Sequence, residues 1–328
     1  MNITEFSKIA QVSKSAVSRY FNNGYLSQDK REKIEEAIRT TGYCPSIQAQ
    51  TIRTRKTKLV GVIIPKLSSE SCAKVTEGIS EILSEEGYQI LLANTANDPE
   101  KEIEYLDLFR QNRVDGVIFL ATVFSQAHHT LLRKMRIPVI IVGQQYKGYN
   151  CVCHDDYGAA HALTTLMISK GSSNPAFLGV TNEDISAGLS RKEGFIQAVK
   201  DAGIAIGASN IGLSDFTMES GYVQTKRMLS TALRPDCLLC ATDNIALGAM
   251  QYCREKHISI PGDIMIAAFG DNKIDRVTEV SLTSAHLHYT TSGRDAAQML
   301  LLNLRTNETV PKILKLDYEI IERQSTQK

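Results

Sequence analysis

The chain has 328 residues, 43% of them hydrophobic and 22% charged, which is typical of a soluble globular protein with about two domains. No apolar run reaches the roughly 18–20 residues of a membrane helix, and the N-terminus does not resemble a secretory signal. Seven scattered cysteines indicate reduced thiols, so we expect a cytoplasmic protein with no membrane partner.

Charge is divided unevenly along the chain. Residues 1–58 carry 11 Lys/Arg and 5 Asp/Glu, a net charge of +6, whereas residues 59–328 carry 26 and 31, a net charge of −5. A basic head on an acidic body indicates a nucleic-acid-binding module joined to a part that does not bind nucleic acid.

The pattern of residues 1–45 predicts a head of three short helices. Ser13 is a good N-cap for the second helix, from Lys14 to about Phe21, and Ser27 caps the third, which ends at Gly42.

The first two helices and the tight turn between them predict a helix-turn-helix, whose second helix enters the major groove of DNA. Lys14, Ser15 and Arg19 are its exposed polar positions and suit contacts to base edges. Ser13 and Ser18 suit phosphate contacts. The alternative is an ordinary solvated face of a helix.

Residues 46–58 are the expected connection between the head and the rest of the chain. The segment 46–53 has the pattern of one more short helix, and the basic polar run 54–58 is typical of a linker.

From residue 59, near-continuous apolar strands alternate with helices. Strands are expected at 59–65, 89–93, 116–121, 138–142, 176–180, 209–213, 237–241, 264–269, 282–286 and 313–321, and helices at 70–86, 100–112, 126–134, 157–170, 188–202, 218–232, 243–256 and 292–304. This alternation predicts an α/β core of parallel sheets covered on both faces.

The number of strands predicts two doubly wound lobes that divide near residue 155. We expect residues 59–156 and 285–310 to form the first lobe, and residues 157–284 and 311–328 the second.

Signatures of enzymes and metal sites are weak. HExxH, Walker and GxSxG motifs are absent from the sequence, and Cys237 and Cys240 point to opposite faces of an apolar strand, so we expect buried thiols. His128 and His129 are expected on the surface of a helix. We therefore expect no catalytic residue, no metal and no cofactor.

Polar residues follow the carboxyl ends of the strands, where doubly wound lobes bind ligands. They include Gln144, His154, Asp156 and Asn272 beside the residues that we expect to bind an effector: Lys66, Ser68, Asp155, Arg191, Thr242, Asp243 and Asp271. Arg and carboxylates aimed into a cleft suit a polyol, because they form charge-assisted hydrogen bonds to hydroxyls. For Asp243 the alternative role is to cap the helix that begins there.

Five segments together resemble the motifs of the LacI/GalR (lactose-repressor) family nearly from end to end. They are the VSxxTVSRVxN-like run Val12–Asn22, the GYxPNxxAxxL-like hinge from Gly42 to Ile52, the VDGII-like strand Val114–Ile118, the RxxGF-like run Arg191–Phe195 and the A-x-D-x-x-A-x-G-like run Ala241–Gly248.

The resemblance implies a dimeric transcription regulator with a core like the periplasmic sugar-binding proteins and three crossovers between lobes. It implies that Arg191 and Asp243 touch the effector and that Asn22 belongs to the DNA-binding set. It also implies that the segment with Ala49 and Ile52 folds as a hinge helix on operator DNA and wedges into the minor groove.

Two departures from the family pattern bear on function. Ile52 replaces the usual Leu of the wedge, and Gly270 replaces the first Asp of a GFDD-like segment that sugar-binding members often carry. The second departure allows a bulkier or phosphorylated sugar, with Lys66 or His154 as partners of its anionic group. The sequence ends at Lys328 without a heptad tail, so we expect a homodimer.

The sequence thus predicts a repressor of carbohydrate-utilisation genes that binds double-stranded operator DNA and a sugar or sugar-phosphate effector. Two alternatives remain open: a sugar-binding or sugar-modifying enzyme on the same core, and a regulator controlled by a partner protein. The basic head argues against an enzyme.

Overall fold

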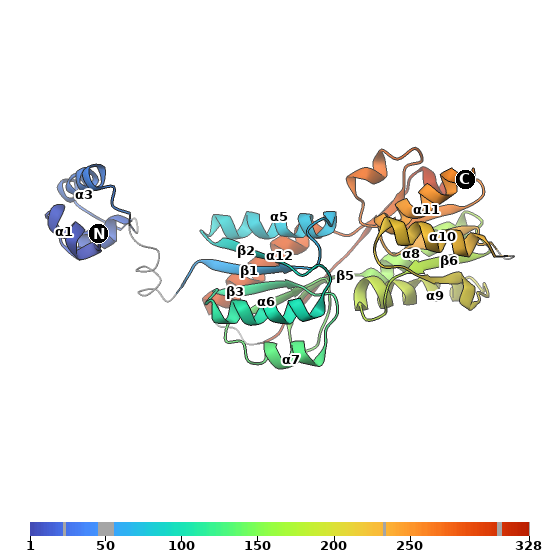
Figure 1. Ribbon diagram of the computed structural model, residues 1–328, viewed down its shortest axis with the longest axis horizontal. Helices are drawn as coiled ribbons and strands as arrows, with labels where there is room; N and C mark the ends of the chain where they lie inside the picture. The colour runs from blue at the N-terminus through green and yellow to red at the C-terminus, as the bar shows by residue number, and fades with distance from the viewer. Residues whose placement is uncertain (22–23, 45–55, 232–233, 307–309, 328) are drawn as a thin grey trace. The chain divides into compact units, whose positions relative to one another are not determined.

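A computed structural model describes residues 1–21, 24–44, 56–231, 234–306 and 310–327. The chain divides into two compact units, Met1–Lys58 and Leu59–Lys328, which we describe separately (Figure 1). The positions expected to contact DNA at Asn22, Ala49 and Ile52, and the expected hinge helix at 46–53, lie outside the described residues.

The head contains the three expected helices: α1 (Ile3–Ile9), α2 (Lys14–Phe21) and α3 (Gln28–Thr41). The side chain of Ser13 accepts the Ala16 N–H at 3.2 Å at the start of α2, and Gly42 ends α3 with a φ of 63°. Phe6 stacks on Tyr43, with ring centroids 4.1 Å apart, at the centre of a small apolar core. This core fixes α2 against the other two helices.

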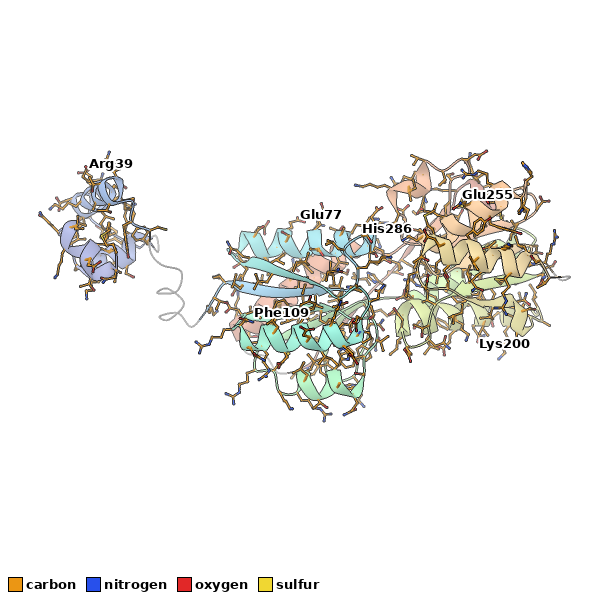
Figure 2. All side chains as sticks on the ribbon, viewed as in Figure 1. Arg39, Glu77, Phe109, Lys200, Glu255 and His286 are labelled. Carbon is orange, nitrogen blue, oxygen red and sulfur yellow. The ribbon has the colours of Figure 1, made fainter. Side chains whose placement is uncertain are left out.

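The first lobe is built on a six-stranded sheet of parallel strands. Its order is β11-β5-β4-β3-β1-β2, with β1 Leu59–Ile64, β2 Gln89–Asn94, β3 Gly116–Leu120, β4 Val139–Val142, β5 Asn150–His154 and β11 Ile313–Leu316. Helices α5 (Glu70–Glu85) and α12 (Tyr289–Thr306) pack on one face, and α6 (Pro99–Gln111) and α7 (Gln126–Leu132) on the other. In Figure 2 the side chain of Phe109, on α6, lies over this sheet.

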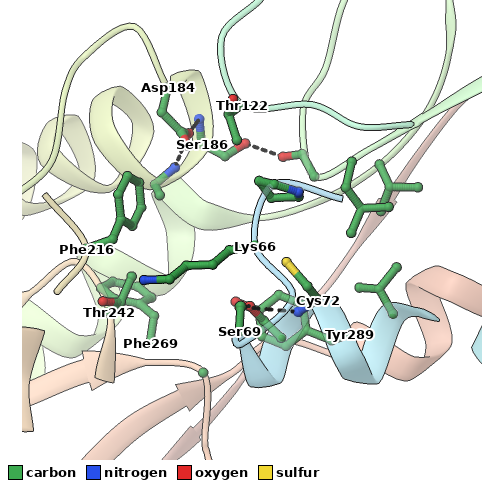
Figure 3. Close-up of a pocket in the computed structure, with 18 of the residues that line it drawn as sticks. Lys66, Ser69, Cys72, Thr122, Asp184, Ser186, Phe216, Thr242, Phe269 and Tyr289 are labelled. Carbon is green, nitrogen blue, oxygen red and sulfur yellow. Dashed lines mark hydrogen bonds between the residues drawn. The ribbon is translucent and has the colours of Figure 1, made fainter. Parts of the chain in front are cut away.

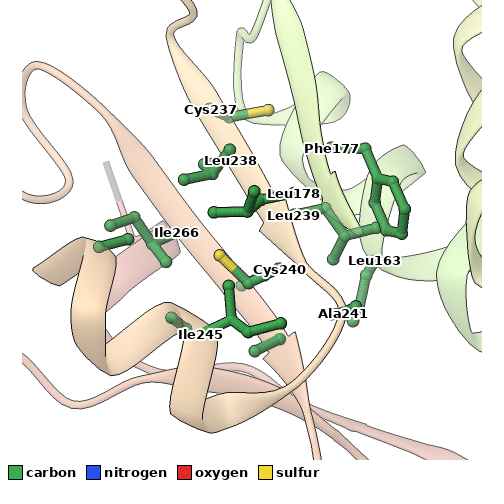
Figure 4. Close-up of a cluster of buried hydrophobic side chains, with 14 of the residues drawn as sticks. Leu163, Phe177, Leu178, Cys237, Leu238, Leu239, Cys240, Ala241, Ile245 and Ile266 are labelled. Atoms are coloured by element: carbon green, nitrogen blue, oxygen red, sulfur yellow. The ribbon is translucent and has the colours of Figure 1, made fainter. Parts of the chain in front are cut away.

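The second lobe repeats the plan. Its sheet has the order β12-β10-β9-β8-β6-β7, with β6 Pro175–Gly179, β7 Ile211–Leu213, β8 Cys237–Cys240, β9 Met265–Phe269, β10 Thr283–His286 and the antiparallel β12 Glu319–Ile321. Helices α8 (Asp156–Ser169) and α9 (Arg191–Asp201) form one pair, and α10 (Met218–Leu229) and α11 (Asp243–Glu255) the other. Figure 4 shows the core between sheet and helices, in which Cys237 and Cys240 are buried thiols as expected.

Helices α5 and α12 cross at van der Waals contact of their backbones because glycine lies at the crossing. A Cβ on Gly78 would stand 2.1 Å from the carbonyl oxygen of Thr290, and one on Gly293 would stand 2.1 Å from that of Val75. Two such positions in one helix pair leave little room for α5 and α12 to slide past each other.

The chain crosses between the lobes after β5, after β10 and after β11. The expected lobe boundaries are therefore wrong near the C-terminus: β10 belongs to the second sheet as far as His286, and β11 belongs to the first. The expected strand 313–321 is two strands in different sheets, because its alternating pattern continues without a break through the crossover at Asp317. Strand β5 was not predicted.

Candidate functional site

A cavity of about 210 Å³ lies between the two lobes, at the carboxyl ends of the strands (Figure 3). Of the seven residues expected to bind an effector, Lys66, Arg191 and Thr242 line it. Other polar or aromatic residues of its wall are Ser69, Glu70, Ser71, Asn97, Thr122, Gln144, His154, Asp156, Asp184, Ser186, Phe216, Asn244, Phe269, Asn272 and Tyr289.

Arg191 begins α9 and is held on several sides. Its Nε and Nη2 donate to Oδ1 of Asp156 at 2.8 and 2.7 Å, Nη1 donates to the Ala241 carbonyl, and the guanidinium carbon lies 4.3 Å from the centroid of the Phe269 ring. Burial opposes the charged form, yet the Asp156 carboxylate raises the pKa of Arg191 above its ordinary value. Arg191 is a permanently charged, immobilised part of the wall.

Three polar atoms in the wall lack hydrogen-bond partners within the described part of the chain. They are Oε1 of Gln144, Nε2 of His154 and Oδ1 of Asn272. Burial lowers the pKa of His154 to about 4, so its ring is neutral near pH 7. Because an unmatched buried polar group costs free energy, these atoms mark where a ligand's hydroxyls would bind.

Direct contacts join the lobes on both sides of the cavity. On one side the Gln144 amide donates to Asp184 at 2.9 Å and the Ser186 hydroxyl donates to the Gly143 carbonyl. On the other side Nζ of Lys74 reaches the Asp271 carbonyl at 3.1 Å. The relative position of the lobes therefore depends on groups that lie in or next to the cavity wall.

Two of the predicted effector ligands, Ser68 and Asp155, lie outside this cavity. Ser68 lines a separate shallow depression. Asp155 is the N-cap of α8, where it accepts the Gly158 N–H at 3.2 Å and pairs with Lys315 at 2.6 Å. The helix cap and the ion pair with Lys315 therefore satisfy this carboxylate without a ligand.

Asp243 and Asp271 also lie behind the wall, contrary to expectation. Asp243 is completely buried and accepts hydrogen bonds from the Ser284 hydroxyl at 2.7 Å and the Asn272 N–H at 3.2 Å. Asp271 pairs with Arg323 and with His286, the latter at 3.1 Å, at the junction of the lobes (Figure 2). Their acceptor oxygens are satisfied by the protein itself. Thr242, one residue before Asp243, is the true cap of α11.

A pair of carboxyl groups lies directly behind the wall. The Asn272 N–H donates to Oδ2 of Asp275 at 2.8 Å as well as to Asp243. Burial and the neighbouring Asp243 carboxylate raise the pKa of Asp275 to about 8. The pair therefore holds one proton near neutral pH.

One further prediction is wrong: His128 is buried, not on the surface. Its Nε2 lies 3.1 Å from Oε2 of Glu102, both side chains are inaccessible to solvent, and the other Glu102 oxygen accepts the Thr122 hydroxyl at 2.8 Å. The Ser125 N–H donates to Nδ1 of His128 at 3.1 Å, so Nε2 carries the proton that is shared with Glu102. The His128–Glu102 pair lies behind the cavity wall and holds the Thr122 side chain in position through this hydrogen bond.

On the head, α2 exposes the side chains of Lys14, Ser15 and Arg19 while its apolar face is buried. Ser13 is exposed and its hydroxyl lies 2.9 Å from that of Ser15, and Ser18 is half-buried. Tyr25, which follows α2, is 90% exposed and was not among the residues predicted to contact DNA.

Among the described residues, no group of three or more His, Cys, Asp or Glu is arranged to hold a metal ion. No described helix combines the length and the apolar character that crossing a membrane requires.

Family comparisons agree with this division of the chain. Residues 2–46 match the model of bacterial regulatory proteins of the lacI family, and residues 57–324 match that of periplasmic binding proteins and the sugar-binding domain of the LacI family. The chain belongs to the LacI family. It is a DNA-binding regulatory protein, and the match of its head decides against the alternative of an enzyme.

Individual LacI-family relatives resemble it over nearly their whole length. The sucrose operon repressor of Staphylococcus xylosus is 33% identical, with 91% of this chain and 92% of the relative covered. The regulator RegA of Clostridium saccharobutylicum is 28% identical, with 99% of each covered. The lac repressor dimer bound to operator superposes with a TM-score of 0.90 at 21% identity and 99% coverage of each chain, which confirms the fold.

The departure of this LacI-family chain at Gly270 has a physical reason. Gly270 has a φ of 142°, and a Cβ there would stand 2.3 Å from Oδ2 of Asp243. A side chain at this position is incompatible with the buried Asp243. The cavity wall therefore has no side chain at this position.

Proposed function

We propose that this LacI-family regulator is a cytoplasmic, homodimeric repressor of carbohydrate-utilisation genes, and that a sugar or sugar phosphate in the cleft between its lobes controls its affinity for operator DNA. The observation that carries the proposal is the pairing of an exposed basic helix in the head with a cavity whose polar atoms lack partners. The name of the sucrose operon repressor supports the carbohydrate genes.

In this proposal α2 lies in the major groove. Lys14, Ser15 and Arg19 contact base edges, and Ser13 and Ser18 contact phosphates, because these side chains stand at the N-terminal half and along one face of the helix. Asn22, Ala49 and Ile52 complete the DNA-binding set on the family pattern alone.

In the cleft, Lys66, Arg191 and Thr242 contact the effector together with Gln144 and His154. The unpartnered atoms of the last two supply one acceptor and one ring nitrogen for hydroxyls. A partly open cavity with a few polar groups in its wall favours a small molecule over a partner protein as the controlling ligand.

A second copy of the chain is the partner that we propose for an exposed apolar surface on the second lobe. Val277 is 75% exposed and Ile274 45%, and both lie beside Met218 at the edge of a depression that also contains Leu247 and Met250. Burial of such a surface in a homodimer removes apolar area from water.

The proposal is tested by titrating the purified full chain with a selected operator and with a scrambled duplex of the same length, at two salt concentrations. We expect the operator to bind more tightly, and both affinities to fall steeply with salt because phosphate contacts release counterions. Equal affinity for both duplexes would contradict a sequence-specific regulator.

The control by a small molecule is tested by thermal shift against neutral sugars and their phosphate esters. An effector at 100 times its dissociation constant adds about 2.7 kcal/mol to the free energy of unfolding. The same compound must then change operator affinity, and a compound that binds without changing it is not the effector.

A further inference from the structure

The charged groups in the wall of the cavity have partners, with the exception of one lysine. Arg191 pairs with Asp156, and Glu70 pairs with Lys74 at 3.1 Å. Asp184 accepts the Ser186 and Ala187 N–H groups at 3.0 and 2.8 Å as well as the Gln144 amide. Within the described chain, no hydrogen bond or ion pair satisfies the ammonium group of Lys66.

Lys66 follows β1 in the first lobe, but its side chain crosses toward the second lobe. Figure 3 shows it extended through the cavity, with the ammonium end beside Thr242, Phe216 and Phe269. Asp184 stands on the other side of the cavity in the same view. Lys66 is half-buried and its ammonium group has no acceptor among the described residues, so it is available to pair with an anionic ligand that enters the cavity.

The surroundings of this ammonium group can complete an anion site. Thr242 receives the Ile245 N–H on its oxygen at 3.5 Å, which leaves its hydroxyl hydrogen free to donate. Asn244, the second residue of α11, also lines the cavity and offers an amide donor. Lys66 and these two donors come from different lobes.

Two other residues of the cavity wall suit neutral hydroxyls. His154 and Gln144 are 7% and 2% exposed, and each has an unpartnered polar atom in the wall.

From these observations, and resting on the proposed function, we infer that the effector is an anionic sugar, a phosphate ester or a sugar acid. Its anionic group binds Lys66, Thr242 and Asn244, while its hydroxyls bind Gln144 and His154. Since the anionic group bridges the lobes, its charge stabilises one lobe arrangement over the other, which is the requirement for regulation.

The test compares matched ligands by isothermal titration of the purified full chain. The pairs are glucose with glucose 6-phosphate, fructose with fructose 6-phosphate, and sucrose with sucrose 6-phosphate, and glucuronate and gluconate distinguish a carboxylate from a phosphate. We expect one anionic compound to bind about 10- to 100-fold more tightly than its neutral counterpart, as for a hydrogen bond between charged groups.

Substitutions of Lys66 then test whether this residue causes the preference for the anionic ligand. Lys66→Gln should abolish the preference for the anionic ligand, Lys66→Arg should retain most of it, and Lys147→Gln, which removes an exposed lysine of the same lobe outside the cavity, should leave it unchanged. Circular dichroism melting checks that each variant is folded.

The outcomes separate the inference from the proposed function. If a neutral sugar binds as tightly as its anionic counterpart, or if Lys66→Gln keeps the preference, the inference is overturned and the proposed function stands. If neither neutral nor anionic sugars bind, the proposed control by a sugar fails and the inference fails with it.

Discussion

Arg191 and Asp156 form an ion pair in which two guanidinium nitrogens donate to a single carboxylate oxygen, at 2.8 and 2.7 Å. The side chains are only 6% and 4% exposed, so each charge depends on the other for compensation. Arg191 was predicted from sequence as an effector ligand, and the pair gives it a structural role in addition to its place in the wall.

Replacing Arg191 by Ala should therefore destabilise the core as well as alter the cavity. We expect Arg191→Ala to lower the free energy of unfolding by about 3–5 kcal/mol, because Asp156 is left buried and unpaired. Urea unfolding measures this, with Arg294→Ala as control: its pair with Glu81 is about half exposed and should contribute under about 1 kcal/mol. Similar losses in the two variants would contradict a structural role for Arg191.

Arg19 should read a base pair rather than add only charge. We expect Arg19→Ala to weaken operator binding by about 1–3 kcal/mol and to relax the preference at one position of each half-site. Arg39→Ala, which removes an exposed arginine paired with Glu36 on α3, should leave sequence preference intact. The measurement is the affinity of each protein for a set of single-base operator variants. If Arg19→Ala lowers affinity by the same factor for every variant, Arg19 contacts phosphate and does not read a base.

Asp275 should make stability depend on pH. Its pKa in the folded chain is about 8, above the ordinary value of 3.8, so its contribution is fully present below pH 3.8 and is lost as pH rises through 8. Asp275→Asn mimics the protonated form. We expect it to melt above the unmodified chain by a margin that is small at pH 5 and larger at pH 9, by about 2–4 °C for each kcal/mol regained.

Differential scanning calorimetry at the two pH values provides the measurement. Asp317→Asn, at an exposed position, should show no such divergence. If Asp275→Asn and the unmodified chain melt in parallel from pH 5 to 9, the carboxyl pair does not hold its proton as described.

Gly270 should tolerate no side chain. Gly270→Ala places a Cβ 2.3 Å from Oδ2 of Asp243 at a φ of 142°, and we expect a loss of about 1–3 kcal/mol in stability together with a distorted cavity. Gly207→Ala is the matched control, since its Cβ would meet nothing closer than 3.7 Å. A Gly270→Ala protein as stable as Gly207→Ala would show that Asp243 can move.

Sequence patterns predicted the two lobes because apolar strands and amphipathic helices are local features of the chain. They failed where the structure of a segment depends on pairing with segments that are distant in the sequence. Strand β5, Asn150–His154, is short and contains two cysteines, and only its pairing with β4 and β11 makes it a strand. The segment 313–321 has one alternating pattern, and nothing local indicates that Asp317 lies at a change of sheet.

The same limit applied to the cavity. Strand ends located the site, and Lys66, Arg191 and Thr242 do line it. The direction of a carboxylate beside them was not predictable, because Asp243 turns toward Ser284, 41 residues away in the sequence. His128 was assigned to the surface since its partner Glu102 lies 26 residues earlier on another helix.

The position of β11 has a consequence for biosynthesis. This strand pairs with β5 in the first sheet, yet about 160 residues separate Cys151 from its partner Ile313, and all strands of the second lobe except β12 are made between them. During synthesis on the ribosome, the edge of β5 that pairs with β11 stays unpaired until almost the entire chain has emerged. An exposed strand edge invites pairing with another chain, so a nascent protein stalled before Ile313 should be prone to aggregation and dependent on chaperones.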